Sequence, residues 1–253
     1  MEIKIIKCLA DNFSYILFDK KTSLSVVIDP SEAGPIIEVI EKNNLNLKYV
    51  INTHHHYDHV GGNQELKEKY NCKIAAYEAD KDRIPGIDIN LKNNQTWKNE
   101  LFECKILHIP GHTSGHICVY INKINALFTG DTLFSLGCGR IFEGTYDEMY
   151  DSLNKLKSFP KQTQIYCGHE YTKKNSDFCI YFDPKNNKLQ EKVLVINKHI
   201  QNGTPTVPTL LEDELECNIF LRSDNSEIQK QLGINSEDPF ETFVKLRDLK
   251  DNF

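Results

Sequence analysis

The segment of this chain with the most potential metal ligands contains three consecutive histidines, His54, His55 and His56. Residues 53–63 read T-H-H-H-Y-D-H-V-G-G-N and come directly after the apolar run 49–51, so the segment begins at the end of a predicted strand. Residues two apart in an extended backbone point to the same side, so His54 and His56 can converge on one metal ion while His55 faces away.

Asp58 and His59 follow His56 closely and could reach a second ion beside the first. Gly61 and Gly62 suit a tight turn into a helix that begins near the site. Four potential ligands thus lie within six residues, and imidazole and carboxylate are common ligands of zinc and iron. The segment therefore predicts a metal site.

Two metal ions need more ligands than this segment supplies, and three later segments offer them. His112 lies in P-G-H-T-S-G-H, Asp131 in F-T-G-D-T and His169 in Y-C-G-H-E, and each follows a glycine at the end of an apolar run. This recurrence places the donors on loops at one edge of a sheet, where glycine permits close backbone approach. The set predicts a hydrolase that activates water on two metal ions.

We assign no metal-binding or catalytic role to the other histidines and the eight cysteines. We expect His55 and His116 to support the ligands as hydrogen-bonding partners, because metal-bound imidazoles need such neighbours. His108 is assigned to a strand and His199 to an exposed helical face. The cysteines are scattered without a C-x-x-C pair, so we expect reduced, buried thiols without catalytic use.

Short β-rich runs and turns alternate as far as about residue 170 and must position these donors. Period-two and apolar patterns predict strands at residues 2–7, 15–19, 24–28, 49–53, 73–76, 103–108, 116–121, 126–129 and 164–167. Helices are predicted at residues 35–43, 62–70 and 146–157. This layout is mixed α/β, with sheets packed together and helices outside.

The pattern changes after Tyr171 to lysine-rich amphipathic stretches. Helices are predicted at residues 173–181, 187–201, 226–232 and 238–249, with Gly203 and nearby prolines between them. We therefore expect two domains: residues 1–172, which carry the donors, and a smaller, mostly α-helical domain at residues 173–253.

Composition limits the partners of such a protein. The chain has 253 residues, 40% hydrophobic and 26% charged, and a formal net charge of −6, which provides no general attraction to nucleic acid or an anionic membrane. No apolar run has the length of a membrane span, and the N-terminus does not read as a signal peptide. We expect a cytoplasmic protein, a monomer, that binds neither nucleic acid nor membrane.

The donor motifs resemble those of the metallo-β-lactamase superfamily, whose H-x-H-x-D-H motif and later His, Asp and His ligands match here in order and spacing. The resemblance implies an αββα sandwich over residues 1–172. It also implies the ligand sets: His54, His56 and His112 for one metal, Asp58, His59 and His169 for the other, and Asp131 as a bridge. Asp29, in V-I-D-P, matches a strand-end aspartate that is usually structural.

Further stretches resemble the glyoxalase II family, the hydroxyacylglutathione hydrolases, over essentially the whole chain. They are G-C-G-R-I-F-E-G-T (137–145), C-G-H-E-Y-T (167–172), T-V-P-T (206–209) and L-R-D-L-K-D-N-F (246–253). The resemblance implies that four residues bind glutathione: Arg140, Tyr171, Arg247 and Lys250. Arg247 and Lys250 are three apart and would share a helix face, where they could grip a carboxylate.

Two residues depart from the family pattern in the first of these stretches. Arg140 stands where the human-type pattern has lysine, which changes a point donor into a planar fork. Phe142 stands where a tyrosine often supplies a hydroxyl, so one hydrogen bond to the ligand would be missing. We expect altered affinity and unaltered chemistry.

The resemblance implies hydrolysis of S-D-lactoylglutathione to D-lactate and glutathione. A metal-bridging hydroxide would attack the thioester with Asp58 and Asp131 as the catalytic carboxylates, on two divalent ions, zinc first, with iron or manganese as alternatives. A glutathione persulfide dioxygenase with one iron on the same fold is the nearest alternative. A lactonase or β-lactamase, a nuclease and a metal-stabilised binding protein are more distant ones.

Overall fold

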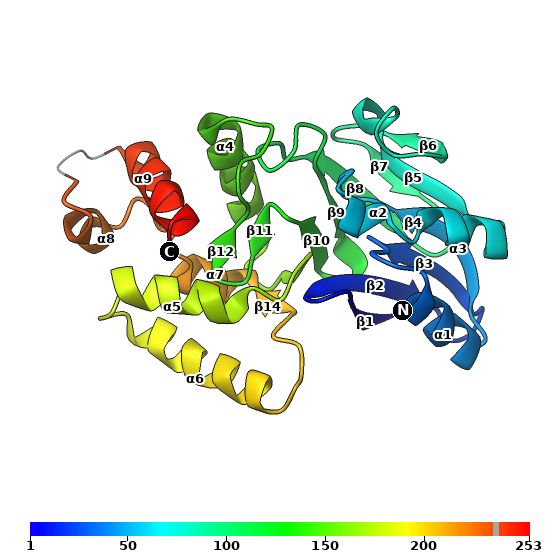
Figure 1. Ribbon diagram of the computed structural model, residues 1–253, viewed down its shortest axis with the longest axis horizontal. Coiled ribbons are helices and arrows are strands. Elements are labelled where there is room, and N and C mark those ends of the chain that lie inside the picture. The colour runs from blue at the N-terminus through cyan, green and yellow to red at the C-terminus, as the bar shows by residue number, and fades with distance from the viewer. Residues whose placement is uncertain (235–237) are drawn as a thin grey trace. The chain divides into compact units, whose positions relative to one another are not determined.

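The computed structural model describes residues 1–234 and 238–253, which form two compact units (Figure 1). Unit 1 comprises Met1–His108 and Gly115–Gly130, and unit 2 comprises Ile109–Ser114 and Asp131–Phe253. The domain boundary at 172/173 stays a prediction, and residues 235–237 of the predicted second domain lie outside the described residues.

Unit 1 begins with a six-stranded sheet whose strands lie in chain order. Its strands are β1 (Glu2–Cys8), β2 (Asn12–Phe18), β3 (Leu24–Ile28), β4 (Asn46–Ile51), β5 (Lys73–Tyr77) and β6 (Ile87–Leu91). β1 to β3 pair antiparallel, whereas β3 to β6 pair parallel. Parallel neighbours need crossovers, which α1 (Gly34–Lys42) and α3 (Asn63–Tyr70) supply between β3 and β5.

Alternation along these strands separates the two faces of the first sheet. One face packs its apolar side chains against Ile36 and Ile40 of α1 and Leu66 of α3, in a single buried cluster. From the other face the ring of Tyr15 meets Phe128 edge-on, with centroids 5.3 Å apart. Phe128 belongs to a second sheet, so unit 1 is a helix layer on two packed sheets.

The second sheet in unit 1 is antiparallel, in the order β10-β9-β8-β7. Its strands are β7 (Thr96–Lys98), β8 (Glu103–His108), β9 (Ile117–Ile121) and β10 (Ala126–Gly130). Unit 1 also has one-turn helices: α2 (Tyr57–Val60), η1 (Glu78–Asp80) and η2 (Asn122–Ile124). Every residue of β9 and β10 is buried, which explains their uninterrupted apolar runs.

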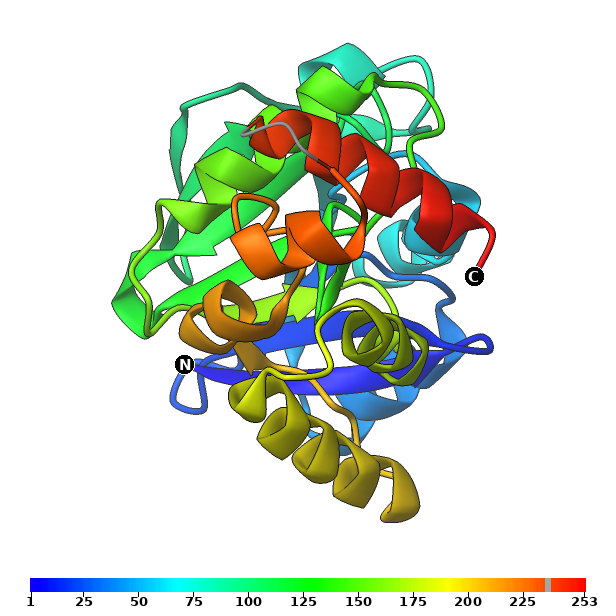
Figure 2. The ribbon, with the colours of Figure 1, turned by 90° about the vertical axis from the view of Figure 1, so that its left-hand side faces the viewer.

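Unit 2 is mostly helical. Its helices are α4 (Tyr146–Lys157), α5 (Thr172–Phe182), α6 (Asn187–Gln201), α7 (Leu211–Cys217), α8 (Ser226–Gln231) and α9 (Pro239–Asp251). Its short strands are β11 (Leu133–Phe134), β12 (Gly137–Cys138), β13 (Gln164–Cys167) and β14 (Thr209–Leu210). Figures 1 and 2 both show α5 beside α6, and α4 beside the red α9.

Aromatic side chains and one buried carboxylate hold unit 2 together. The ring of Phe178 stacks on Phe220 with centroids 5.9 Å apart, and Phe243 fits against Tyr150 at 5.4 Å. Glu214 is fully buried and accepts a 2.7 Å hydrogen bond from the backbone N–H of Leu136 in the β11–β12 hairpin. Burial raises the pKa of this carboxyl group. Helix α7 thus fixes the hairpin that precedes Arg140.

The mixed α/β prediction and most predicted elements are confirmed. The strands at 24–28, 103–108 and 164–167 and the helices at 146–157 and 187–201 have the predicted bounds. Strands β6 and β7 and helix α7 were not predicted, because they are short and their polar residues hide the period. Among the described residues no helix is both long and apolar enough to cross a membrane.

Candidate functional site

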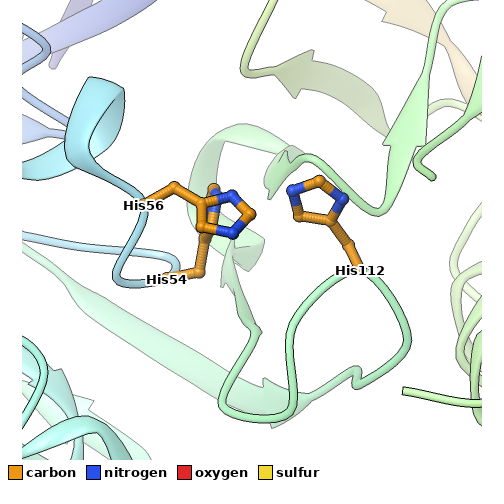
Figure 3. A group of neighbouring side chains, drawn as sticks. All are labelled: His54, His56 and His112. Carbon is orange, nitrogen blue, oxygen red and sulfur yellow. The ribbon is translucent and has the colours of Figure 1, made fainter. Parts of the chain in front are cut away.

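The predicted donors of unit 1 lie directly after β4, at the carboxyl end of a parallel strand. Figure 3 shows the neighbouring rings of His54 and His56 on this segment. Their centroids are 4.7 Å apart. The same figure shows His112 on the loop after β8. His54 and His59 are 0% and 1% exposed, and their ring centroids are 4.1 Å apart. One turn of helix, α2, which the sequence did not predict, carries Asp58 and His59.

Hydrogen bonds around Asp29 set the protonation of two of these histidines. Thr53 donates from Oγ1 to Asp29 Oδ2 at 2.6 Å, and its hydroxyl lies 3.1 Å from Nδ1 of His54. His59 Nδ1 lies 3.1 Å from Asp29 Oδ2. A carboxylate only accepts, so both Nδ1 atoms carry the proton, and both Nε2 atoms keep the lone pair that a metal ion needs. The strand-end aspartate therefore orients the ligands.

Asn12 supports Asp58 in the same way. Its Nδ2 donates to the carboxylate of Asp58 at 2.9 Å and to the backbone carbonyl of Asp58 at 3.0 Å. The carboxylate of Asp58 is then 3.8 Å from Nε2 of His59. The sequence does not single out Asn12, because nothing in the pattern at the start of a strand indicates a contact 46 residues away.

His55 and His116 take supporting positions. His55 Nδ1 lies 3.6 Å from the carboxylate of Asp80, which is completely buried and also pairs with Arg83. His116 stacks on His54 with centroids 4.6 Å apart and an interplanar angle of 19°. A supporting role for His55 and His116 stays a prediction, and His55 also belongs to a group with His56 and Glu143 that could hold a metal ion.

The predicted donors of unit 2 converge on one carboxylate. Oδ2 of Asp131 lies 3.5 Å from Nε2 of His112 and 3.2 Å from Nε2 of His169, and all three residues are at most 5% exposed. Nδ1 of His112 is 2.8 Å from the carbonyl oxygen of Arg140, so this nitrogen carries the proton. In the neutral imidazole, Nε2 of His112 then presents a lone pair toward the carboxylate, and a metal ion between the two would satisfy both. The donors therefore fit a metal ion.

Close backbone packing holds these two loops together. A Cβ atom on Gly139 would lie 1.9 Å from the carbonyl oxygen of Asp131 and 3.2 Å from Nδ1 of His112. Gly130 has a φ of +47°, and a Cβ there would lie 2.4 Å from Oγ1 of Thr53 in unit 1. A Cβ on Gly111, which precedes His112, would lie 2.7 Å from the Cα of Met149. Gly111 and Gly130, the glycines before His112 and Asp131, therefore serve close approach, as expected.

Gly61 and Gly62 have a related use. Their backbone is helical, and a Cβ on either would come within 3.0 Å of the backbone of Ser31 or Glu32. They permit tight packing of α2 and α3, whereas the sequence suggested a turn that needs glycine.

The residues that the resemblance assigned to glutathione all lie in unit 2. Arg140 is exposed, Tyr171 stacks on His169 with centroids 4.7 Å apart, and Lys250 Nζ lies 4.9 Å from the ring centre of Phe178. Arg247 is only 3% exposed. Burial lowers the pKa of Lys250 from 10.5 to about 8.

Thiol chemistry is not part of this site. All eight cysteines are buried and carry reduced thiols. Cys167, the cysteine next to the His169 loop, has a thiol whose pKa burial raises to about 12, so it is no nucleophile at neutral pH.

Histidines and carboxylates on strand-end loops, in a chain with two packed sheets, are the pattern of a metallohydrolase of the metallo-β-lactamase superfamily. The family model of that superfamily matches residues 12–169, and the model of the hydroxyacylglutathione hydrolase C-terminus matches residues 170–253. The chain belongs to the hydroxyacylglutathione hydrolase family of that superfamily, and it is a hydrolase.

Individual relatives agree with this assignment. A hydroxyacylglutathione hydrolase from Pelagibacter ubique is 55% identical, over 100% of both chains. A cytoplasmic hydroxyacylglutathione hydrolase from Arabidopsis thaliana is 41% identical over 100% of this chain and 99% of its own. ETHE1 from Myxococcus xanthus shares the fold, with a TM-score of 0.71 and 20% identity over 98% of this chain and 90% of its own.

Proposed function

We propose that this protein hydrolyses 2-hydroxyacylglutathione thioesters, S-D-lactoylglutathione first among them, to D-lactate and glutathione. The observation that carries the proposal is the carboxylate of Asp131, which lies against Nε2 of both His112 and His169 in a member of this family. That arrangement suits a carboxylate shared between two metal ions.

The proposed centre holds two divalent ions, zinc or else iron or manganese. One would be bound by His54, His56 and His112, the other by Asp58, His59 and His169, with Asp131 shared. In support, each of these residues except Asp131 belongs to a group of histidines and carboxylates that could hold a metal ion. When bound, the ions supply hydroxide at neutral pH, because a metal lowers the pKa of water from 15.7 to about 7.

The protein's own side chains prepare the reaction in three ways. Asp29 and the carbonyl of Arg140 keep the imidazole lone pairs available, as described above. The carboxylates of Asp58 and Asp131 would help to hold the ions, and one of them could accept the single hydrogen bond that orients the attacking nucleophile. The leaving thiol has a pKa around 8.5, so the thiolate departs without a strong acid.

Glutathione binding is proposed for Arg140, Tyr171, Arg247 and Lys250. In support, the side chains of Arg140 and Arg247 both reach the carboxylate of Asp251. Phe142 is 61% exposed and has its ring 5.2 Å from that of His112, so it offers an apolar surface where the family often has a hydroxyl.

Thiol release from S-D-lactoylglutathione by the purified, metal-replete protein tests this function. Elemental analysis of the same sample should find two metal ions per chain. His54→Ala should lose metal and turnover, whereas His199→Ala, at an exposed position of α6, should keep both. A fully metallated sample that releases no thiol would contradict the proposal. Oxygen consumption with a glutathione persulfide would instead indicate the dioxygenase.

We also propose a cytoplasmic monomer that has the small-molecule thioester as its partner and binds neither nucleic acid nor membrane. The net charge of −6 supports the absence of nucleic acid, and the Arabidopsis relative is named as cytoplasmic. Light scattering of the purified protein should give a mass near 29.2 kDa. A mass of twice that value would replace the monomer by a dimer.

A further inference from the structure

A carboxylate of the protein itself lies between two of the residues proposed to bind glutathione. Oδ1 of Asp251 accepts a hydrogen bond of 2.8 Å from Nη2 of Arg247 and lies 3.3 Å from Nε of Arg140. All three residues belong to unit 2. One carboxylate held by two guanidinium groups is also the chemistry by which a substrate carboxylate would be bound there.

Most of the guanidinium group of Arg247 is already in contact with other parts of the protein, and the side that a ligand could reach is the one that Asp251 contacts. Its Nη1 donates to the carbonyl oxygen of Cys138 at 2.7 Å and lies 3.4 Å from that of Gly139. Its guanidinium carbon stands 5.3 Å from the ring centre of Phe220, and its side chain is 4% exposed. An incoming carboxylate therefore meets Arg247 at the place of Asp251.

The side chains of Asp251 and Arg140 are much more exposed than that of Arg247. Asp251 is the last residue of α9 and its side chain is 39% exposed, while that of Arg140 is 59% exposed. Partly exposed ion pairs are weak, and exposed side chains change rotamer within nanoseconds. Moving Asp251 out of the pair therefore costs little.

We propose that Asp251 is a built-in competitor of the substrate's carboxylate. In the free protein its carboxylate occupies the place where a carboxylate of the glutathione moiety would bind to Arg140 and Arg247, and it turns toward solvent when the thioester binds. After hydrolysis it returns and helps to release glutathione. This inference rests on the proposed function, because it needs glutathione in that place.

Asp251→Asn tests the inference, because it keeps the shape of the side chain and removes its charge. Asp248→Asn is the matched control: it removes the same charge from the same helix, but Asp248 contacts the hydroxyl of Tyr146 instead of the arginines. An aspartate near a helix C-terminus opposes the helix dipole, so neither change should prevent folding. Circular dichroism of both variants verifies the fold.

Calorimetry should measure the binding of S-methylglutathione, which is not hydrolysed, and of its analogue with carboxamides in place of its carboxylates. We expect Asp251→Asn to tighten S-methylglutathione about two- to fivefold, the factor that corresponds to releasing a partly exposed ion pair. The control should leave this affinity unchanged, and the carboxamide should bind equally to all three proteins.

An unchanged or weakened affinity in Asp251→Asn would overturn the inference, as would an equal gain for the carboxamide. The turnover of S-D-lactoylglutathione by the unaltered protein tests the proposed function separately. Turnover together with an unchanged Asp251→Asn affinity would refute the competitor alone. Absence of both turnover and S-methylglutathione binding in the unaltered protein would refute both.

Discussion

At the scale of single residues, the metal donors depend on neighbours that never touch a metal. Asp29 accepts hydrogen bonds from Thr53 and His59, and its backbone has a φ of +48°. Through these contacts one buried carboxylate sets which nitrogen of His54 and His59 carries the proton. The ligands are thus prepared before any ion arrives.

Asp29→Ala should lower metal affinity about 10- to 100-fold, because two imidazoles lose the partner that orients them. Titration with a competing chelator measures this affinity. Asp19→Ala is the control, since Asp19 also accepts backbone N–H groups, those of Lys21 and Thr22, but in an exposed turn. Equal affinities in the two variants would show that Asp29 does not orient the ligands.

Lys250 carries a prediction about pH. Burial lowers its pKa to about 8, so the ammonium group is charged below that pH and neutral above it. A carboxylate ligand needs the charge, so KM for the glutathione thioester should rise between pH 7 and pH 9. Lys250→Arg keeps the charge over this range and should flatten the rise, and a rise of the same size in this variant would exclude Lys250 as its cause.

At the scale of elements, the β11–β12 hairpin and the loop after it connect α9 to the donors. Arg247 of α9 binds the carbonyl of Cys138, and two residues later the carbonyl of Arg140 accepts from His112. Between them, Gly139 passes close to the backbone of Asp131. A change in this loop should therefore alter the affinity of the protein for both the metal and the substrate.

Gly139→Ala should lower metal affinity and the free energy of unfolding, the latter by about 1–3 kcal/mol, because backbone atoms must move to admit the methyl group. Urea unfolding and chelator titration measure the two effects. Gly34→Ala is the control: it lies at the start of α1 with nothing within 4 Å of the new Cβ. A Gly139→Ala variant as stable as this control would contradict the packing argument.

At the scale of the whole molecule, each unit has a core of its own that needs no metal. Unit 1 is held by the cluster under α1 and α3, and unit 2 by stacked aromatic rings such as Phe178 and Phe220. The metal should therefore stabilise a fold that exists without it.

Removal of metal with a chelator should abolish thioester hydrolysis and leave the far-ultraviolet circular dichroism spectrum unchanged. The Tm should fall and rise again on addition of zinc, because an ion that binds only the folded state stabilises it by mass action. Loss of the helical signal together with the metal would show instead that metal binding drives folding.

The order of the donors, their glycines and most of the helices followed from the amino-acid sequence alone. Metal ligands are few in kind and strand-end loops carry them in a recognisable pattern, so the sequence by itself allowed a ligand set to be proposed: His54, His56, Asp58, His59, His112, Asp131 and His169. Long amphipathic helices such as α6 were equally predictable, because their period is local.

Only the tertiary structure decided what surrounds those residues. Asn12 reaches Asp58 across 46 residues and Arg247 reaches Cys138 across 109, and no local pattern encodes such contacts. Likewise the proton positions on His59 and His112 depend on Asp29 and on the carbonyl of Arg140, which only folding brings near. The competition between Asp251 and a substrate carboxylate also depends on tertiary structure, because only folding brings Asp251, at the end of α9, beside Arg140.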